Sequence, residues 1–299
     1  MPKLRSGFTA GVIAYALWGL LPLYWPLLKP ASATELLAHR IVWSLFVLIA
    51  LIAATDGLSR LRAVERRQVR LLAFGSVLVA INWGTFIYGV NSDRVVETSL
   101  GYFINPLVTV ALGVLVLKET LRPAQRTAVL IALAAVVVLT VDYGHPPWLA
   151  LTLAFSWASY GLIKKRADVD AIESLSIETA VLFLPALALI VTLSATGEGT
   201  VTTEGSGHVA LLVGSGVMTA VPLLFFGAAA VRIPLVTLGL LQYIAPVMQF
   251  LIGVLVYGEP MPASRLVGFA LVWVALTVFA TDAARRNRAP VAAMPEPAT

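Results

Sequence analysis

The hydrophobic pattern of the chain consists of long apolar stretches separated by short polar connections. A window of about 20 apolar residues is long enough to cross roughly 30 Å of hydrocarbon as a helix. Ten such windows occur, at residues 8–28, 33–54, 70–91, 97–117, 122–142, 147–165, 173–195, 208–231, 234–256 and 262–283. The pattern therefore predicts ten membrane-spanning helices, and the short connections predict antiparallel packing of neighbouring helices.

The composition fits a chain whose solvent is largely lipid. Of its 299 residues, 59% are hydrophobic and 12% are charged, whereas soluble domains carry about 25% charged residues. So few charges cannot cover a water-facing surface, and we expect an all-α integral membrane protein. Two polar stretches, the loop 197–207 and the tail 284–299, are predicted to be disordered.

The positive charges test the ten-span prediction independently. With a cytoplasmic N-terminus, the inner segments hold 17 of the 21 lysines and arginines, including the run 164–166 after the sixth span. The outer loops hold Lys29, Arg94 and Arg265. Membrane proteins carry such an excess in their cytoplasmic segments. The pattern predicts that both termini, including the tail, are cytoplasmic, and it accounts for the net charge of +5 without a nucleic-acid partner.

One segment of the chain occurs twice in similar form. Residues 99–119 read SLGYFINPLVTVALGVLVLKE, and residues 237–259 read TLGLLQYIAPVMQFLIGVLVYGE. Pro106 and Pro246 are 140 residues apart, and the glutamates that close the two segments keep this offset. The repetition predicts that the chain was built from two copies of one unit.

The duplication predicts two halves, residues 1–142 with spans one to five and residues 143–283 with spans six to ten. Because five is an odd number, the second half enters the membrane from the opposite side, so the two halves are inverted relative to each other. Glu119 is then inside and Glu259 outside. Inverted repeats are typical of secondary transporters, whose substrate site lies near the midplane between the repeats.

Sequence stretches in both halves carry a resemblance to known membrane proteins. They are NW with FIYGVN (82–91), ETSLGYFINPL (97–107), LKE (117–119), SYGLIKK (159–165), IET (177–179), VPLLFF (221–226), TLGLLQYIAP (237–246), YGE (257–259) and FALVWVALTVF (269–279). With these stretches the chain resembles the EamA-domain family of the drug/metabolite transporter superfamily, and its RarD branch most closely. The resemblance implies a bacterial inner-membrane exporter of small molecules, with ten spans in two EamA repeats. The branch name is associated with chloramphenicol sensitivity but does not supply a substrate.

Polar and aromatic side chains within the spans are the candidates for a substrate site. A polar group in hydrocarbon is costly unless it faces a partner or a wet cavity. The predicted substrate-binding residues are Trp18, Asn82, Tyr88, Tyr102, Asn105, Trp157, Tyr160, Gln242 and Tyr243. Trp18 and Trp157 occupy matched mid-span positions, where they either line the cavity and stack on a planar substrate or fill the core of the bundle.

Two amides lie close before prolines in the repeated segment, and the prolines are candidate gating positions. Pro106 and Pro246 each remove a backbone donor and free a carbonyl one turn earlier. Together with Asn105 and Gln242, these carbonyls are predicted to bind a substrate near the midplane. The structural alternative is that the amides link neighbouring helices, which stabilises a membrane bundle by about 0.6–2 kcal/mol each.

Arg40 and Glu178 are charged residues at corresponding places within spans two and seven. Because the halves are inverted, each charge lies near a different face of the membrane, and we expect separate local partners rather than one ion pair. Glu178 is a candidate for proton coupling or gating, and Arg40 is a candidate for attracting an anionic group. The alternative role for both is structural anchoring at the interface.

The sequence offers no catalytic, cofactor or metal motif. It lacks a metal-binding HExxH, a serine nucleophile elbow and a Walker A loop, and it has no cysteine. We therefore expect a non-enzymatic secondary transporter in the bacterial cytoplasmic membrane, whose partners are a small-molecule substrate and lipid. The competing interpretations are a membrane enzyme or lipid-handling protein, and a non-transporting scaffold or regulator.

Overall fold

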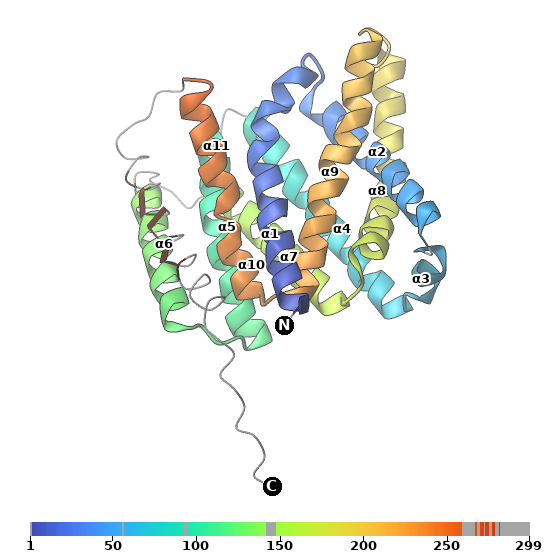
Figure 1. Cartoon of the computed structure of the whole chain (residues 1–299). Helices are drawn as coiled ribbons and strands as arrows, with labels where there is room; N and C mark the ends of the chain where they lie inside the picture. Colours follow the sequence, from blue (N-terminus) through green and yellow to red (C-terminus); the bar gives the residue numbers. More distant parts are fainter. Residues whose placement is uncertain are drawn as a thin grey trace.

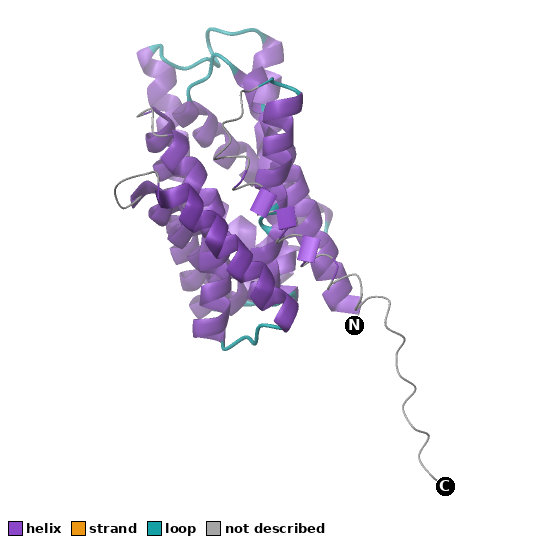
Figure 2. Ribbon diagram, turned by 90° about the vertical axis from the view of Figure 1, so that its left-hand side faces the viewer, coloured by secondary structure: helices purple, strands orange, loops and turns teal. Residues whose placement is uncertain are grey.

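The computed structural model describes residues 2–55, 57–91, 95–141 and 148–258, with isolated positions between 267 and 281. Regular structure in these ranges is helical, and the helices lie side by side in one bundle (Figures 1 and 2). The α-helices are α1 (Pro2–Leu20), α2 (Ala33–Ala54), α3 (Gly57–Ala63), α4 (Arg66–Asn91), α5 (Val95–Leu117), α6 (Pro123–Val141), α7 (Trp148–Ala167), α8 (Ala171–Thr196), α9 (Ser206–Arg232), α10 (Leu235–Leu241) and α11 (Ile244–Leu255). Two short 3-10 helices, η1 (Leu21–Leu23) and η2 (Trp25–Leu28), follow α1.

The predicted spans correspond to these helices. The first window covers α1 with η1 and η2, the ninth covers α10 with α11, and the seven between them each fall on one helix. The tenth window lies mostly outside the described residues. Among the described residues, five helical segments are long and apolar enough to cross a membrane: Leu4–Leu23, Ala33–Ala54, Arg66–Phe86, Ala171–Thr196 and Ser206–Arg232. The all-helical class is confirmed for the described part of the chain.

The ninth predicted span is not one helix but two. α10 ends at Leu241 and α11 begins at Ile244, so the helix is interrupted at Gln242 and Tyr243. Pro246 has no N–H to donate to the carbonyl of Gln242 four residues earlier, which explains the position of the break. In the matching segment, Pro106 lies inside the uninterrupted helix α5.

The end of the bundle at which α1 begins also holds the last turn of α7. Lys165 Nζ donates to the carbonyl oxygen of Ile233, directly after α9, at 2.6 Å. Gly7 packs so closely on α9 that a Cβ atom there would lie 2.9 Å from Ile233 Cγ2. Gln68 Nε2, at the start of α4, donates to the carbonyl of Ala167 at 2.9 Å. Helices α1 and α7 therefore run in opposite directions through the bundle.

Two buried carboxylates make reciprocal contacts between the two predicted halves. Glu35, at the start of α2, accepts hydrogen bonds from Thr200 N at 2.6 Å and Thr200 Oγ1 at 3.0 Å, in the loop after α8. Glu173, at the start of α8, forms an ion pair with Arg60 Nε at 2.8 Å, in α3 after α2. Each of these two long helices therefore binds the segment that follows the other.

The loop between α8 and α9 is ordered, and the predicted disorder of residues 197–207 is wrong. Gly197 ends α8 in the left-handed conformation at φ 76°, which suits a residue without a Cβ atom. Thr200 is buried, and its Oγ1 also lies 2.8 Å from His208 Nε2. The hydrogen bonds to Glu35, in the other predicted half, fix the position of this polar loop. The local sequence of the loop shows only turn signals and does not reveal this partner.

Helices α2 and α9 cross with their backbones in close contact. A Cβ atom at Gly216 on α9 would lie 2.5 Å from Trp43 Cβ and 2.7 Å from the backbone nitrogen of Ser44. Ser44 Oγ donates to the carbonyl of Gly216 at 3.1 Å. Glycines of the repeated segment also pack closely, because a Cβ atom at Gly239 would lie 3.0 Å from the carbonyl oxygen of Pro106.

The carboxylate of Glu119 caps α10, which belongs to the other predicted half. Its Oε1 accepts a hydrogen bond from Leu235 N and its Oε2 accepts one from Val236 N, each at 2.8 Å. These two groups are among the first N–H donors of α10, which have no partner within the helix. Pro234, which precedes them, has a side chain that cannot accept a hydrogen bond, so the cap is supplied by Glu119, two residues after the end of α5.

Glu119→Ala is expected to lower the free energy of unfolding by roughly 1–3 kcal/mol, because two partly buried N–H groups lose their acceptor. Glu119→Gln retains one acceptor oxygen and should lose less. The measurement is the SDS-induced unfolding of the purified protein. Glu204→Ala removes an exposed carboxylate and serves as the control; equal stability of the Glu119→Ala and Glu204→Ala variants would contradict the capping role.

Candidate functional site

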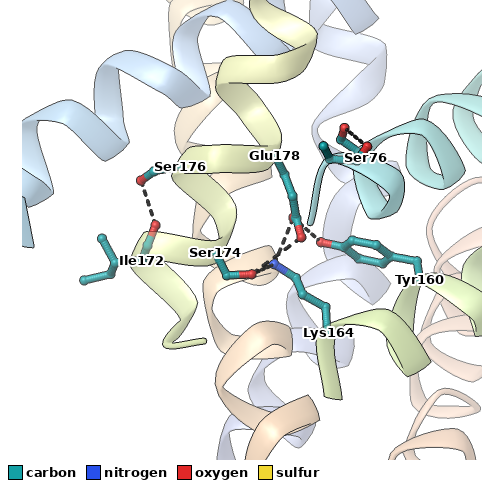
Figure 3. A network of polar contacts seen from close by, with 8 residues as sticks. Ser76, Tyr160, Lys164, Ile172, Ser174, Ser176 and Glu178 are labelled. Atoms are coloured by element: carbon teal, nitrogen blue, oxygen red, sulfur yellow. Dashed lines mark hydrogen bonds and ion pairs between the residues drawn. The ribbon is translucent and has the colours of Figure 1, made fainter. Parts of the chain in front are cut away.

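Four polar side chains converge between α7 and α8 (Figure 3). Lys164 Nζ lies 2.8 Å from Glu178 Oε2, and both side chains are buried. Tyr160 donates its hydroxyl to the same carboxylate oxygen at 2.8 Å, and Lys164 also donates to Ser174 Oγ at 2.6 Å. Tyr160 and Lys164 are four residues apart on α7, as are Ser174 and Glu178 on α8, so each pair shares one helix face. The two faces meet across the hairpin, and there the ammonium group of Lys164 neutralises the buried carboxylate of Glu178.

The position of Lys164 corrects the sequence-based interpretation. The sequence assigns Lys164 to an inner connection with Lys165 and Arg166, whereas the structure places its ammonium group inside the bundle. Its partner Glu178 is the residue predicted to take part in coupling or gating. A buried carboxylate requires a compensating cation or hydrogen-bond donors, and that requirement points to a nearby basic residue.

A small cavity adjoins this polar cluster. Its volume is about 20 Å³, enough for a water molecule. It is lined by Ile41 and Ser44 from α2, Ser76, Val79 and Trp83 from α4, Tyr160 from α7, Leu175, Glu178, Thr179 and Leu182 from α8, and Thr219 and Leu223 from α9. Residues of both predicted halves therefore form its wall, which is mainly apolar, with Glu178 and several hydroxyl groups as its polar members.

Aromatic side chains pack beside the cavity around Phe226, which is fully buried. The ring of Tyr160 stacks on that of Phe226, with centroids 5.7 Å apart and an interplanar angle of 12°. Trp18 and Trp157 contact each other edge to face at 5.3 Å and both contact Phe226. The structure thus brings together three predicted residues, Trp18, Trp157 and Tyr160, but of these only Tyr160 reaches the cavity wall.

Arg40 approaches the cavity from α2. Its Nε donates to Thr219 Oγ1 at 2.8 Å, and its guanidinium carbon lies 4.9 Å from the ring centroid of Trp25 and 5.0 Å from that of Trp83. Trp83 and Thr219 also line the cavity. Arg40 and Glu178 have separate partners, Thr219 and Lys164.

The predicted amides link helices, and two of their oxygens have no partner among the described residues. Asn82 Nδ2 donates to the carbonyl of Leu153 at 2.8 Å, joining α4 to α7, and Gln242 Nε2 donates to Thr109 Oγ1 at 2.9 Å. Within the same part of the chain, the buried oxygens Asn105 Oδ1 and Gln242 Oε1 accept no hydrogen bond. Buried polar atoms without a partner are rare and mark places where water or a ligand can bind.

The remaining predicted residues lie away from the cavity wall. Tyr243 is buried and its hydroxyl donates to the carbonyl of Phe103 at 3.3 Å, whereas Tyr88 and Tyr102 are exposed. Pro106 is buried within α5, and Pro246 is partly buried in α11. Sequence reasoning missed Lys164, Thr219 and the hydroxyl groups of the cavity, because small polar residues are common in membrane helices and give no local signal.

Comparison with known proteins supports one family. The model of the EamA-like transporter family matches twice, over residues 5–141 and 147–281. The chain is 53% identical over 290 residues to "Protein RarD" of Streptomyces exfoliatus, covering 95% of this chain and 92% of that one. It is 43% identical over 290 residues to an uncharacterized transporter of Pseudomonas aeruginosa, covering 96% and 97%.

A solved crystal structure shares the fold. It superposes with a TM-score of 0.71 over 94% of this chain and 99% of the other, at 23% sequence identity. The resemblance inferred from the sequence motifs is confirmed by the double family match and by relatives that align along nearly the whole chain. The chain belongs to the EamA-like transporter family.

Proposed function

We propose that the protein is a secondary transporter that exports a small organic solute across the bacterial cytoplasmic membrane by alternating access. The observation that carries the proposal is the small cavity between α2, α4, α7, α8 and α9, whose mainly apolar wall includes the buried carboxylate of Glu178. In this proposal, residues 1–142 and 143–283 move against each other around that cavity. A non-transporting scaffold, by contrast, has no need of a buried carboxylate at a cavity between its halves.

Reciprocal contacts support an inverted relation between the halves. Glu35 and Glu173 are 138 residues apart, at the starts of α2 and α8, and each binds the segment that follows the other helix. A two-fold axis in the membrane plane produces such an exchange, because it swaps the two helices and reverses their direction. The opposite directions of α1 and α7 fit the same axis.

The size of the cavity sets a condition for solute binding. Sites for drug-sized ligands measure about 300–1,000 Å³, whereas this cavity measures about 20 Å³. Solute binding at this cavity therefore requires the helices around it to separate. The aromatic contacts of Trp18 on α1 with Trp157 on α7 and Phe226 on α9 cross the line of separation and are candidates for a gate.

Proton coupling is the role we assign to Glu178. Its carboxylate lines the cavity and is held by Lys164, Tyr160 and Ser174. Protonation of the carboxylate removes the attraction to the ammonium group and weakens the link between α7 and α8. Such a change can bias the equilibrium between closed and open states, as alternating access requires.

The function is tested by reconstituting the purified protein in liposomes and measuring the flux of a solute panel that includes chloramphenicol. We expect at least one solute to move faster than in protein-free liposomes, and faster still with an imposed pH gradient. The absence of flux for every solute, with correctly folded protein in the membrane, would favour the scaffold interpretation.

Asn105→Leu is expected to reduce this flux roughly tenfold while leaving stability nearly unchanged. The buried oxygen of Asn105 accepts no hydrogen bond from the described residues, so its removal should hardly change the stability of the fold. A bound substrate, however, would lose one hydrogen bond. The matched control is Asn82→Leu, which breaks the bonds to Leu153 and Ser156 and should lower stability. Unchanged flux in the Asn105→Leu variant would remove this residue from the substrate site.

A further inference from the structure

Arg40 has no carboxylate partner within the part of the chain that the structure describes. No described carboxylate lies within ion-pair distance of its guanidinium group, although Lys164 and Arg60 each have one. Its hydrogen bond to Thr219 uses Nε as the donor. The two terminal nitrogens, which form the end of the guanidinium fork, donate to no described residue.

The guanidinium group is held in place by its neighbours. Trp25 from η2 and Trp83 from α4 both lie within about 5 Å, at the distance of cation–π contacts. Together with the bond to Thr219 on α9, these contacts fix the group from three different elements. A fixed guanidinium with a free fork binds planar carboxylates in bidentate fashion and loses little rotamer freedom in doing so.

The residues around Arg40 indicate the chemistry that the rest of a bound ligand should have. Trp83 and Thr219 contact Arg40 and also line the cavity, so a molecule bound to the fork lies beside the indole of Trp83 and next to the cavity. The cavity wall also carries Glu178, whose charge is already compensated by Lys164. The site therefore offers one uncompensated positive charge and an aromatic surface.

From this arrangement we infer that Arg40 anchors the anionic group of the transported solute, and that the solute is an aromatic or planar organic carboxylate. The inference rests on the proposed transport function and specifies its substrate class. Arg40 is then a binding residue of the cavity, and Trp25 and Trp83 position its guanidinium group. A purely structural role for Arg40 predicts no preference between an anion and a neutral ligand of the same shape.

The test compares naphthalene-2-carboxylate with naphthalene-2-carboxamide, which differ in charge but hardly in shape. Binding to the purified full-length protein is measured by calorimetry and by thermal shift. We expect the wild-type protein to bind the carboxylate roughly tenfold or more tightly than the amide. Arg40→Gln should abolish this preference, Arg40→Lys should retain part of it, and Arg62→Gln, at an exposed position, should leave it intact.

Two outcomes would overturn the inference: equal or absent binding of the two probes by the wild-type protein, or an undiminished preference in Arg40→Gln. The comparison within the wild-type protein decides the question even if Arg40→Gln does not fold. Flux measurements separate this inference from the function itself. Flux of neutral solutes without any binding preference for the carboxylate would reject the anion site and keep the transporter, whereas carboxylate preference without flux of any solute would keep the anion site and reject the transporter.

Discussion

Lys164→Met is expected to destabilise the protein by about 3–5 kcal/mol, because it leaves the buried carboxylate of Glu178 without its cation. The ammonium group lies 2.8 Å from Glu178 Oε2, and both side chains are nearly inaccessible to solvent. Tyr160 and Ser174 remain as hydrogen-bond donors, but neither carries a charge. Stability is measured by SDS-induced unfolding of the purified protein.

The double variant Lys164→Met/Glu178→Met separates folding from function. Replacing both members of a buried ion pair by apolar residues is often neutral for stability, so the double variant should recover most of the loss. Solute flux through the double variant in liposomes should nevertheless be absent, because the carboxylate of Glu178, the proposed proton-coupling group, has been removed. Normal flux in the double variant would exclude the pair from coupling.

The pair of Arg60 and Glu173 provides the control for this experiment. The two pairs have the same 2.8 Å separation, but the side chain of Arg60 is 50% exposed. Arg60→Met also leaves a buried carboxylate, that of Glu173, without its cation, but water can replace the half-exposed Arg60 side chain more easily than it can reach Glu178. Arg60→Met should therefore destabilise the protein less than Lys164→Met, and equal losses would contradict the importance of the cation's burial.

Gly216→Val is the second substitution for which we expect a large effect. A Cβ atom at position 216 would lie 2.5 Å from Trp43 Cβ and 2.7 Å from the backbone nitrogen of Ser44. Because a backbone atom is among the obstacles, α2 and α9 must move apart. We expect a loss of about 3 kcal/mol or more, at the upper end of the cost of overpacking, and the loss of the bond from Ser44 Oγ to the carbonyl of Gly216.

Gly84→Val is the matched control for this crossing. Gly84 also lies within a long helix, α4, but a Cβ atom there would meet nothing within 4 Å. The amount of monodisperse protein in detergent extracts, measured by fluorescence-detected size-exclusion chromatography, should fall for Gly216→Val and change little for Gly84→Val. Similar yields for both variants would mean that the approach of α2 and α9 is not as close as described.

The sequence predicts the helices well because hydrocarbon thickness sets their length. It does not predict the break at Gln242 and Tyr243, because Pro246 interrupts a helix whereas the matching Pro106 leaves α5 continuous. A proline removes one hydrogen bond, and the packing around it decides whether the helix continues. The order of the loop at Thr200 escapes sequence reasoning for a similar reason, since its partner Glu35 lies in the other half.

The sequence predicts the candidate site in part. Glu178, Tyr160 and Arg40 carry strong local signals, because charged and aromatic residues within a span are conspicuous. Lys164 gives no such signal, because it is one of three consecutive basic residues at the end of a span. The short connection from α7 to α8 places residues near the hairpin at similar depth, so the register of the hairpin could have paired Lys164 with Glu178. The tryptophans around Arg40 come from three-dimensional packing, which no periodicity reveals.

The two halves are proposed to have opposite orientations in the membrane. Cysteine labelling tests this orientation directly, because the chain has no cysteine of its own. Single cysteines are introduced at Thr120 and Pro260, one residue after Glu119 and Glu259. We predict that a membrane-impermeant maleimide labels Pro260→Cys in intact cells and Thr120→Cys only after permeabilisation. Labelling of both positions from the same side of the membrane would contradict the inverted arrangement.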